Sequence, residues 1–231
     1  MRPLVISHAA CGGHAPANTL AGIRAALAFN VDGIEIDVQC SKDGVPVLMH
    51  DLTVDRTTNG TGAVAELTLE QLKALDAGGE PPPTLAEVLE LTKGKTLLVC
   101  EIKQPGIEVQ IAETANAADA VEDVMVWSFF PKALEGIRSA EPRIPAVLLV
   151  SERHVDAVPT LRDVAVRTGV QGLSVYYAGV TEDALRLCHR SGLSLFTWTA
   201  DETVEIERLI ATGVDGICTN YPDRVWAALG G

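Results

Sequence analysis

The sequence predicts an α/β protein with the architecture of a (β/α)8 TIM barrel, and two observations carry this prediction. Apolar strands and amphipathic helices alternate along the chain in eight strand–helix units, as is typical of a parallel sheet closed into a barrel. Polar residues stand at or near the carboxyl ends of different strands, and in a barrel these ends meet at one mouth. A doubly wound open sheet is the competing fold, and the placement of the polar residues favours the barrel.

The first part of the chain supplies the opening units of this pattern. A helix with apolar residues at helical spacing follows the first strand, and Asn18 or Thr19 is suited to cap it. The second strand alternates acidic with β-branched residues, which is typical of a strand with two different faces. The expected strands and apolar runs cover residues 4–7, 33–38 and 45–49, and the expected helix covers residues 19–29.

Residues 52–83 interrupt the alternation. They contain a turn-rich segment, DRTTNGTG, a short helical segment, LTLEQLKAL, and a proline-rich exit. We therefore expect a small inserted subdomain here, within a single barrel domain that spans residues 1–231. Loops of this length are usually functional, and because this one follows His50 directly, it should lie over the site.

The second part of the chain is regular. Each expected helix leads to a short apolar strand, and Pro222 is suited to the first turn of the last helix. The helices are expected at 84–91, 106–118, 131–140, 155–168, 181–191 and 202–211, and the strands at 96–103, 124–128, 146–150, 172–175, 194–199 and 216–219.

Composition and charge exclude several classes of partner. The chain has 231 residues, 47% of them hydrophobic, which is enough for one large core. Eighteen basic residues against 31 acidic ones give a formal net charge of −13, which argues against binding to nucleic acid or to an anionic membrane. An anionic substrate would therefore need local positive charge, from a bound metal ion and one or two lysines.

We expect a cytoplasmic protein. The first residues run directly into a strand without a leader, and no window approaches the roughly 18 apolar residues of a membrane span. The five cysteines are scattered and odd in number, which indicates free thiols in a reducing compartment. The sequence gives no indication of the oligomeric state.

Three carboxylates predict a metal site. Glu35 and Asp37 stand two positions apart on a strand, so they share a face, and burying two acids costs several kcal/mol unless a cation compensates them. Glu101 ends another strand and should point into the same cavity. Ligands that are all oxygen atoms favour Mg²⁺ or Ca²⁺ over Zn²⁺.

Two histidines and a lysine complete the predicted chemistry. His50 follows an apolar run and is next to Asp51, which could orient its ring, and His8 ends the first strand. One histidine can accept the proton of an attacking hydroxyl while the other protonates the leaving alkoxide. Lys103 shares a strand face with Glu101 and could form an ion pair there, but contact with a phosphate oxygen makes better use of its charge.

Segments along nearly the whole chain resemble the glycerophosphodiester phosphodiesterase family. They occur in the order and at the spacing found in that family: ISHAACGGHAPANT, GIEIDV, SKDG, VLMHD, DRTTNGTG, PPPTLAEVL, EIK, WSF, TWTA and GVDGICTNYPD. The resemblance implies a TIM-barrel phosphodiesterase with an insertion after the His-Asp motif. It implies metal binding by the three carboxylates, phosphate contact by Lys103, acid–base roles for both histidines, and a substrate cleft walled by Phe129 and Trp198.

Two motifs depart from the family pattern. The family usually has H-R-G where this chain has His8-Ala9-Ala10, and P-E-N-T where it has Pro16-Ala17-Asn18-Thr19. An arginine and a glutamate are therefore both absent, which resembles the removal of a coupled pair. A guanidinium contributes roughly 1.5–3 kcal/mol per charged hydrogen bond, so phosphate binding must depend on other groups.

The expected function is metal-dependent hydrolysis of a glycerophosphodiester to sn-glycerol 3-phosphate and an alcohol. Two alternatives follow from the departures at Ala9 and Ala17. The first is a related phosphodiesterase with a shifted substrate, of the lysophospholipase D type. The second is a catalytically weakened barrel that binds phosphorylated ligands. The sequence leaves the head group, the choice between Mg²⁺ and Ca²⁺, and the attacking group (water or a substrate hydroxyl) open.

Overall fold

Parallel strands close into a barrel in the computed structural model, which describes residues 2–151 and 158–230. Within these residues eight parallel strands follow the order β1-β9-β8-β7-β6-β5-β4-β2, and pairing of β1 with β2 closes the ring, so the predicted (β/α)8 fold is confirmed. The strands are β1 (Leu4–Ser7), β2 (Gly33–Cys40), β4 (Leu97–Ile102), β5 (Val124–Ser128), β6 (Ala146–Val150), β7 (Gly172–Tyr176), β8 (Ser194–Trp198) and β9 (Gly216–Thr219).

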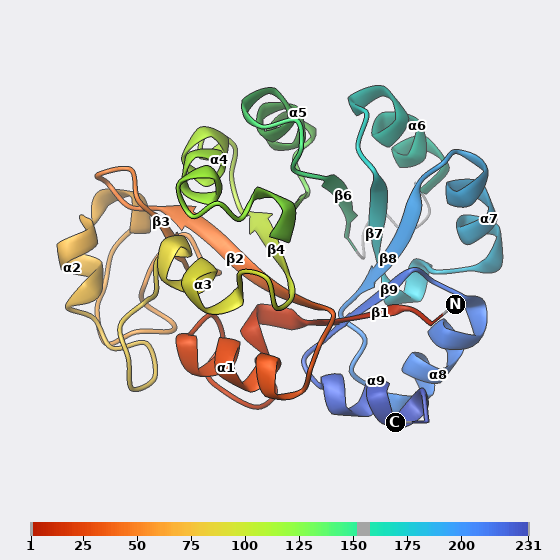
Figure 1. The fold of residues 1–231 in the computed structure, drawn as a ribbon, viewed down its shortest axis with the longest axis horizontal. Coiled ribbons are helices and arrows are strands. Elements are labelled where there is room, and N and C mark those ends of the chain that lie inside the picture. The colour runs from red at the N-terminus through yellow and green to blue at the C-terminus, as the bar shows by residue number, and fades with distance from the viewer. Residues whose placement is uncertain (1, 152–157, 231) are drawn as a thin grey trace.

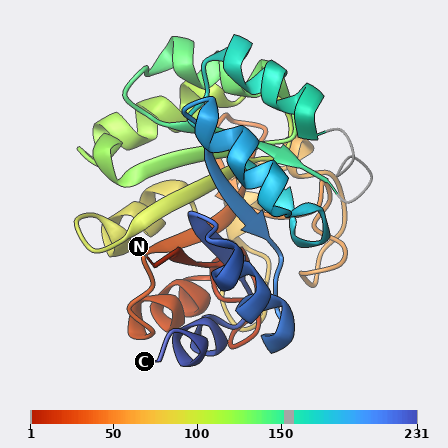
Figure 2. The same ribbon diagram turned by 90° about the vertical axis from the view of Figure 1, so that its right-hand side faces the viewer.

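The helices lie outside the barrel and cover its strands (Figure 1). Their bounds agree with the expected ranges to within a few residues, and the expected start of one helix at 155 lies outside the described residues. They are α1 (Leu20–Ala28), α3 (Leu85–Thr92), α4 (Glu108–Ala117), α5 (Pro131–Ala140), α6 (Val158–Thr168), α7 (Glu182–Arg190), α8 (Thr203–Thr212) and α9 (Pro222–Ala228). The two ends of the chain lie on the same side of the molecule in both views (Figures 1 and 2).

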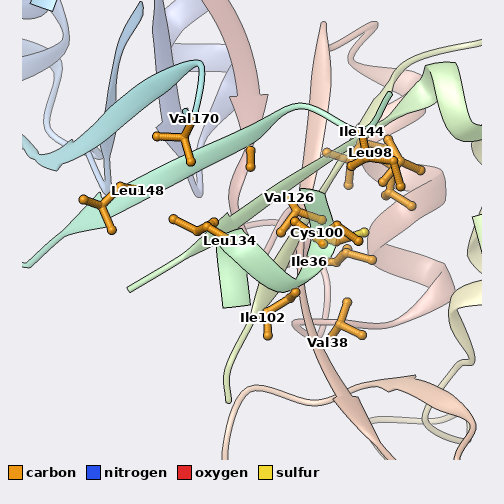
Figure 3. Packing of buried hydrophobic residues seen from close by; sticks show 14 of the residues in the cluster. Ile36, Val38, Leu98, Cys100, Ile102, Val126, Leu134, Ile144, Leu148 and Val170 are labelled. Carbon is orange, nitrogen blue, oxygen red and sulfur yellow. The ribbon is translucent and has the colours of Figure 1, made fainter. Parts of the chain in front are cut away.

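Successive side chains of strand β2 point alternately to the helices outside the barrel and to the barrel interior. Ile34, Ile36 and Val38 face outward and pack with the helices in the main apolar cluster, part of which Figure 3 shows. The residues between them therefore face the inside of the barrel, where β2 carries Glu35 and Asp37. The interior of the barrel is otherwise filled by a smaller apolar cluster of Ile6, Val99, Trp127, Val147, Leu149, Phe196 and Cys218.

Residues 52–83 form the expected insertion. They follow β3 (Pro46–Leu48), which pairs antiparallel with β2 and so forms a hairpin outside the parallel barrel. The segment contains the short helices η2 (Val64–Glu66) and α2 (Leu69–Lys73), with α2 at the left edge of Figure 1. Val54, Val64 and Leu72 pack with Val47 and Met49 in a separate cluster. We interpret the segment as a small subdomain inserted in one barrel domain.

Among the residues that the structure describes, no helix is long and apolar enough to cross a membrane.

Candidate active site

The three predicted metal ligands meet inside the mouth of the barrel. Asp37 on β2 pairs in register with Glu101 on β4, and Glu35 lies two residues earlier on the same face of β2. One oxygen atom from each of the three carboxylates lies within 4.8 Å of those of the other two. Glu35 and Asp37 are 2% and 1% exposed, so their charges are removed from water.

The hydrogen bonding of these carboxylates fits a bound cation. Oε2 of Glu35 accepts the backbone N–H of Ala9 at 2.8 Å, and Oδ2 of Asp37 accepts Nδ2 of Asn18 at 2.6 Å. The other oxygen of each, and Oε1 of Glu101, are buried as well. Among the described residues Oε1 of Glu35 has no partner, and Oδ1 of Asp37 and Oε1 of Glu101 contact only the ammonium of Lys103. Buried oxygen atoms with free lone pairs are costly alone, and they are the ligands that Mg²⁺ and Ca²⁺ prefer. The donor set therefore fits a hard divalent cation.

Electrostatics also point to a missing positive charge. Burial, together with the charges of Asp37 and Glu101, raises the pKa of Glu35 well above its ordinary value. Burial raises the pKa of Glu101 as well, and Asp37 adds to the effect while Lys103 opposes it. Three carboxylates this close cannot all stay ionised without a cation.

Lys103 directly follows β4 and lies between two of the carboxylates. Its Nζ is 2.8 Å from Oε1 of Glu101 and 3.2 Å from Oδ1 of Asp37. Burial alone would lower the pKa of Lys103, but the neighbouring carboxylates outweigh burial and raise it, so the ammonium stays charged. The ion pair that the sequence suggested is therefore present, and contact with a phosphate stays a prediction.

The loop after β1 brings its backbone to the carboxylates. Ala9, Ala10 and Cys11 have φ angles of 46°, 57° and 76°, and three successive left-handed residues turn the chain sharply. This turn directs the N–H of Ala9 at Glu35. The loop packs closely on α1, because a Cβ atom on Gly22 would lie 2.2 Å from the carbonyl oxygen of Ala10.

His8 is held by an asparagine from the other end of the chain. Its Nδ1 lies 2.9 Å from Oδ1 of Asn220. The amide Nδ2 of Asn220 donates to Oδ2 of Asp201 at 2.8 Å, so the oxygen of this amide faces His8. Because the atom facing Nδ1 is an acceptor, we assign the proton of the neutral ring to Nδ1. Nε2 then carries the free lone pair.

His50 has an equivalent arrangement on the insertion side. Its Nδ1 lies 2.7 Å from Oδ1 of Asp51, as expected for a carboxylate that orients the ring. Arg56 binds the same carboxylate in bidentate fashion, with distances of 2.6 and 2.9 Å. The hydrogen bonds from Arg56 and then from His50 lower the pKa of Asp51, so Asp51 stays an anion and Nε2 of His50 is left to react.

The predicted site residues surround one cavity of about 150 Å³ at the barrel mouth, called the mouth cavity below. It is lined by His8, Glu35, His50, Glu101, Lys103, Trp127, Phe129, Leu149, Trp198 and Cys218. Asp37 lies beside it through its contact with Lys103, and Asp51 lies behind His50. The rings of Phe129 and Trp198 pack edge to face, 5.4 Å apart, and form an aromatic wall. A larger groove, about 610 Å³, lies between α3 and α4 outside the barrel and contains none of these residues.

Sequence reasoning missed four residues that organise the site. Asn18 was considered as a cap for α1, but Thr19 accepts the N–H of Gly22 there, and Asn18 instead fixes Asp37 through two hydrogen bonds. Asn220, Asp201 and Arg56 position the histidines. Asn18, Asn220 and Arg56 fall within segments that already carry the family resemblance, which is the signal that could have found them.

Comparison with known proteins agrees with the geometry. Residues 8–224 match the sequence model of the glycerophosphoryl diester phosphodiesterase family. The chain is 38% identical to a glycerophosphodiester phosphodiesterase of Caldanaerobacter subterraneus, over 97% of each chain, and 31% identical to one of Bacillus altitudinis, over 95% of each. Among solved structures, an Oleispira antarctica phosphodiesterase in complex with the product sn-glycerol-3-phosphate superposes with a TM-score of 0.88 at 26% identity, covering 100% of this chain and 98% of that one.

Fold and relatives together define the class of protein. A TIM barrel with relatives of this kind over its full length is a phosphoric diester hydrolase. More narrowly, the chain belongs to the glycerophosphoryl diester phosphodiesterase family.

Proposed function

We propose that the protein hydrolyses a glycerophosphodiester to sn-glycerol 3-phosphate and an alcohol, with a divalent cation and two histidines. One observation carries the proposal: His8, His50 and Lys103 line one cavity at the barrel mouth together with Glu35 and Glu101 of the acidic cluster, and Asp37 lies beside them. The names of the relatives support this substrate class, as does the product bound to the Oleispira antarctica enzyme.

The three carboxylates would hold the cation. Glu35, Asp37 and Glu101 each offer a buried oxygen atom, of which that of Glu35 has no partner among the described residues and the other two contact Lys103. Asn18 and the N–H of Ala9 hold the opposite oxygens of Asp37 and Glu35. Mg²⁺ or Ca²⁺ bound there would neutralise charge on a phosphoryl oxygen and orient it. Lys103 supplies a second positive charge from the rim of the same cluster, and because Ala9 has no guanidinium, the phosphate depends on these two.

The histidines would move the protons. The Nε2 atom of one accepts the proton of the attacking hydroxyl, from water or from the glycerol arm of the substrate. As the new P–O bond forms, the P–O bond to the alcohol breaks, and the protonated Nε2 of the other histidine donates to the leaving oxygen. Attack by water gives sn-glycerol 3-phosphate directly. Attack by the glycerol hydroxyl gives a cyclic phosphate, which water must then open by breaking the new P–O bond. Asn220 and Asp51 keep both rings in the required orientation. Phe129 and Trp198 would border the substrate.

A panel of substrates tests the proposal. Release of sn-glycerol 3-phosphate from glycerophosphocholine should require Mg²⁺ or Ca²⁺ and should stop with a chelator. Preferential turnover of lysophosphatidylcholine would favour the lysophospholipase D alternative. Absence of turnover with both substrates, while sn-glycerol 3-phosphate still binds, would favour a weakened barrel that binds phosphorylated ligands.

We also propose a cytoplasmic location and a role in glycerol and lipid metabolism. All five cysteines are free thiols, four of them buried, as expected for a reducing compartment. Burial raises the pKa of the Cys11 thiol to about 11, so the cysteine nearest to His8 in the chain stays protonated and unreactive.

Exchange of two residues tests the positioning of His8. Asn220→Ala removes the acceptor for Nδ1, so we expect kcat to fall by roughly 10–100-fold while the affinity for the metal is unchanged. The double variant Asn220→Asp with Asp201→Asn should recover most of the rate, because it restores both an acceptor for His8 and a donor between the two side chains. Steady-state kinetics and metal titration measure both effects. Full activity in Asn220→Ala would contradict this role.

A further inference from the structure

A second cavity lies against the same two histidines. It has a volume of about 220 Å³ and is bounded by the first loop, by the end of β3 and by residues of the insertion. We call it the insertion-side cavity. The walls that matter here are Ala9 and Ala17 from the loop, Met49 after β3, and Arg56 and Ala77 from the insertion.

His8 and His50 are walls of both cavities. A diester phosphorus atom bound between them carries two ester arms that diverge, so the arms can enter different cavities. The retained half of the substrate keeps the phosphate, which must stay beside Lys103 and the carboxylates in the mouth cavity. The alcohol that leaves keeps no phosphate and need not remain beside Lys103, so the insertion-side cavity is the space available to it.

Small side chains create the space on this side. A Cβ atom on Gly12 would lie 3.7 Å from the Cβ atoms of both Ala9 and Ala17, so three of the smallest residues meet at one point of the wall. A long side chain at position 9 or 17 would occupy the cavity. Met49 and Ala77 also line the cavity and are apolar and buried, while its polar lining comes from side chains such as Asn18, Thr57 and Asn220.

The charged groups that face this cavity already have partners. The guanidinium of Arg56 is bound by Asp51 at both of its contacts. The carboxylate of Asp37 accepts Nδ2 of Asn18 on one oxygen and lies 3.2 Å from Nζ of Lys103 on the other. An ionic ligand group would have to lose water without gaining a free counter-charge, which is unfavourable.

We propose that the insertion-side cavity is the subsite for the leaving alcohol and that it selects a compact, uncharged arm. This inference rests on the proposed function. A cavity of about 220 Å³ is small, so it suits a compact arm and not a long chain. Small alkanols and glycerol fit this description, whereas a cationic head group or a long chain should be accepted less well.

Two matched substrates test the selection by charge. Glycerophosphocholine and the ester of sn-glycerol 3-phosphate with 3,3-dimethylbutanol have arms of the same shape, and only choline is charged. With wild-type protein and Mg²⁺ or Ca²⁺, we expect kcat/KM to be at least about 10-fold higher for the uncharged ester, because desolvating the cation is not compensated. Equal or better turnover of the choline ester overturns the proposal.

Filling the cavity tests its location. Ala17→Leu fills it from the first loop and Ala77→Leu fills it from the insertion. Each should lower kcat/KM for the dimethylbutyl ester by roughly 10–100-fold while kcat/KM for the methyl ester of sn-glycerol 3-phosphate stays within about 3-fold. Ala21→Leu, on the exposed face of α1, is the matched control and should change neither.

The outcomes separate this proposal from the proposed function. Suppose that wild-type protein hydrolyses the methyl ester, but both filling variants lower kcat/KM for the two esters equally or for neither. Then the subsite proposal is wrong and the proposed function stands. If wild-type protein hydrolyses no glycerophosphodiester at all, the proposed function fails and the subsite fails with it. Two variants are used so that a folding defect in one cannot decide the result.

Discussion

Replacing Glu35 by Gln should abolish metal binding and reduce turnover by about 10³-fold or more. The substitution keeps the shape of the side chain but removes one of the three carboxylates that converge within 4.8 Å. A bound cation contributes several kcal/mol to stabilising the transition state, and each 1.4 kcal/mol corresponds to a factor of ten in rate. Calorimetry with Mg²⁺ and Ca²⁺, and kinetics on a glycerophosphodiester, measure the two effects. Glu108→Gln, at a buried carboxylate on α4, is the matched control.

The same variant should be more thermostable than the wild type once both are stripped of metal. Burial raises the pKa of Glu35 above its ordinary value of 4.5, so without a cation the wild type loses stability as the pH rises above about 4.5, the range in which the unfolded chain ionises. Glutamine cannot ionise, so its advantage should grow with pH. Saturating metal should reverse the order, because only the wild type binds it. If the chelator-stripped wild type binds neither cation, the metal site is wrong.

Alternation along the strands explains how far the sequence could predict the site. Glu35 and Asp37 are separated by one apolar residue, and period two requires them to share a face in any strand. Glu101 ends a strand that a parallel barrel places beside β2, so the three carboxylates could be assigned to one mouth before any coordinates. The hairpin strand β3 does not disturb this count, since it lies outside the parallel ring.

The supporting residues could not be predicted in the same way, because their contacts span large separations in the chain. His8 and Asn220 are 212 residues apart, and no periodicity relates them. Asn18 has a left-handed φ of 57°, which directs it away from the helix it might have capped and toward Asp37. Arg56 lies in a turn-rich segment, where local patterns predict a loop but not the direction of a side chain.

The position of Lys103 could be predicted from the sequence, but its role in catalysis could not. The sequence placed it on the face of Glu101 and left two uses for its charge open. In the structure it pairs with Glu101 and Asp37, which explains its position without deciding whether it also meets a phosphate. The answer depends on how the ion pairs of Lys103 rearrange when substrate binds. Neither strand periodicity nor the barrel geometry gives the free energy of that rearrangement.

The variants His8→Ala and His50→Ala should each lower kcat/KM by roughly 10²–10⁴-fold, which is the usual contribution of a positioned general acid or base. Nδ1 of His8 is held by Asn220 and Nδ1 of His50 by Asp51, so Nε2 is the nitrogen left for chemistry in each ring, and both rings line the mouth cavity. His189→Ala, at a half-exposed histidine paired with Asp215, is the matched control and should leave the rate unchanged. An intact rate in His50→Ala would mean that the site is misassigned.

The dependence of the rate on pH should identify which histidine is the base. If one ring must be neutral and the other protonated, kcat/KM of the wild type is bell-shaped in pH, and each variant loses one limb. The variant that lacks the base loses the acidic limb, and the variant that lacks the acid loses the alkaline limb. Asp51 cannot produce either limb, because Arg56 and His50 lower its pKa and keep it ionised throughout a neutral assay range. Phosphorus NMR of the wild-type reaction adds the identity of the attacking group, since a cyclic phosphate forms only when a hydroxyl of the substrate attacks.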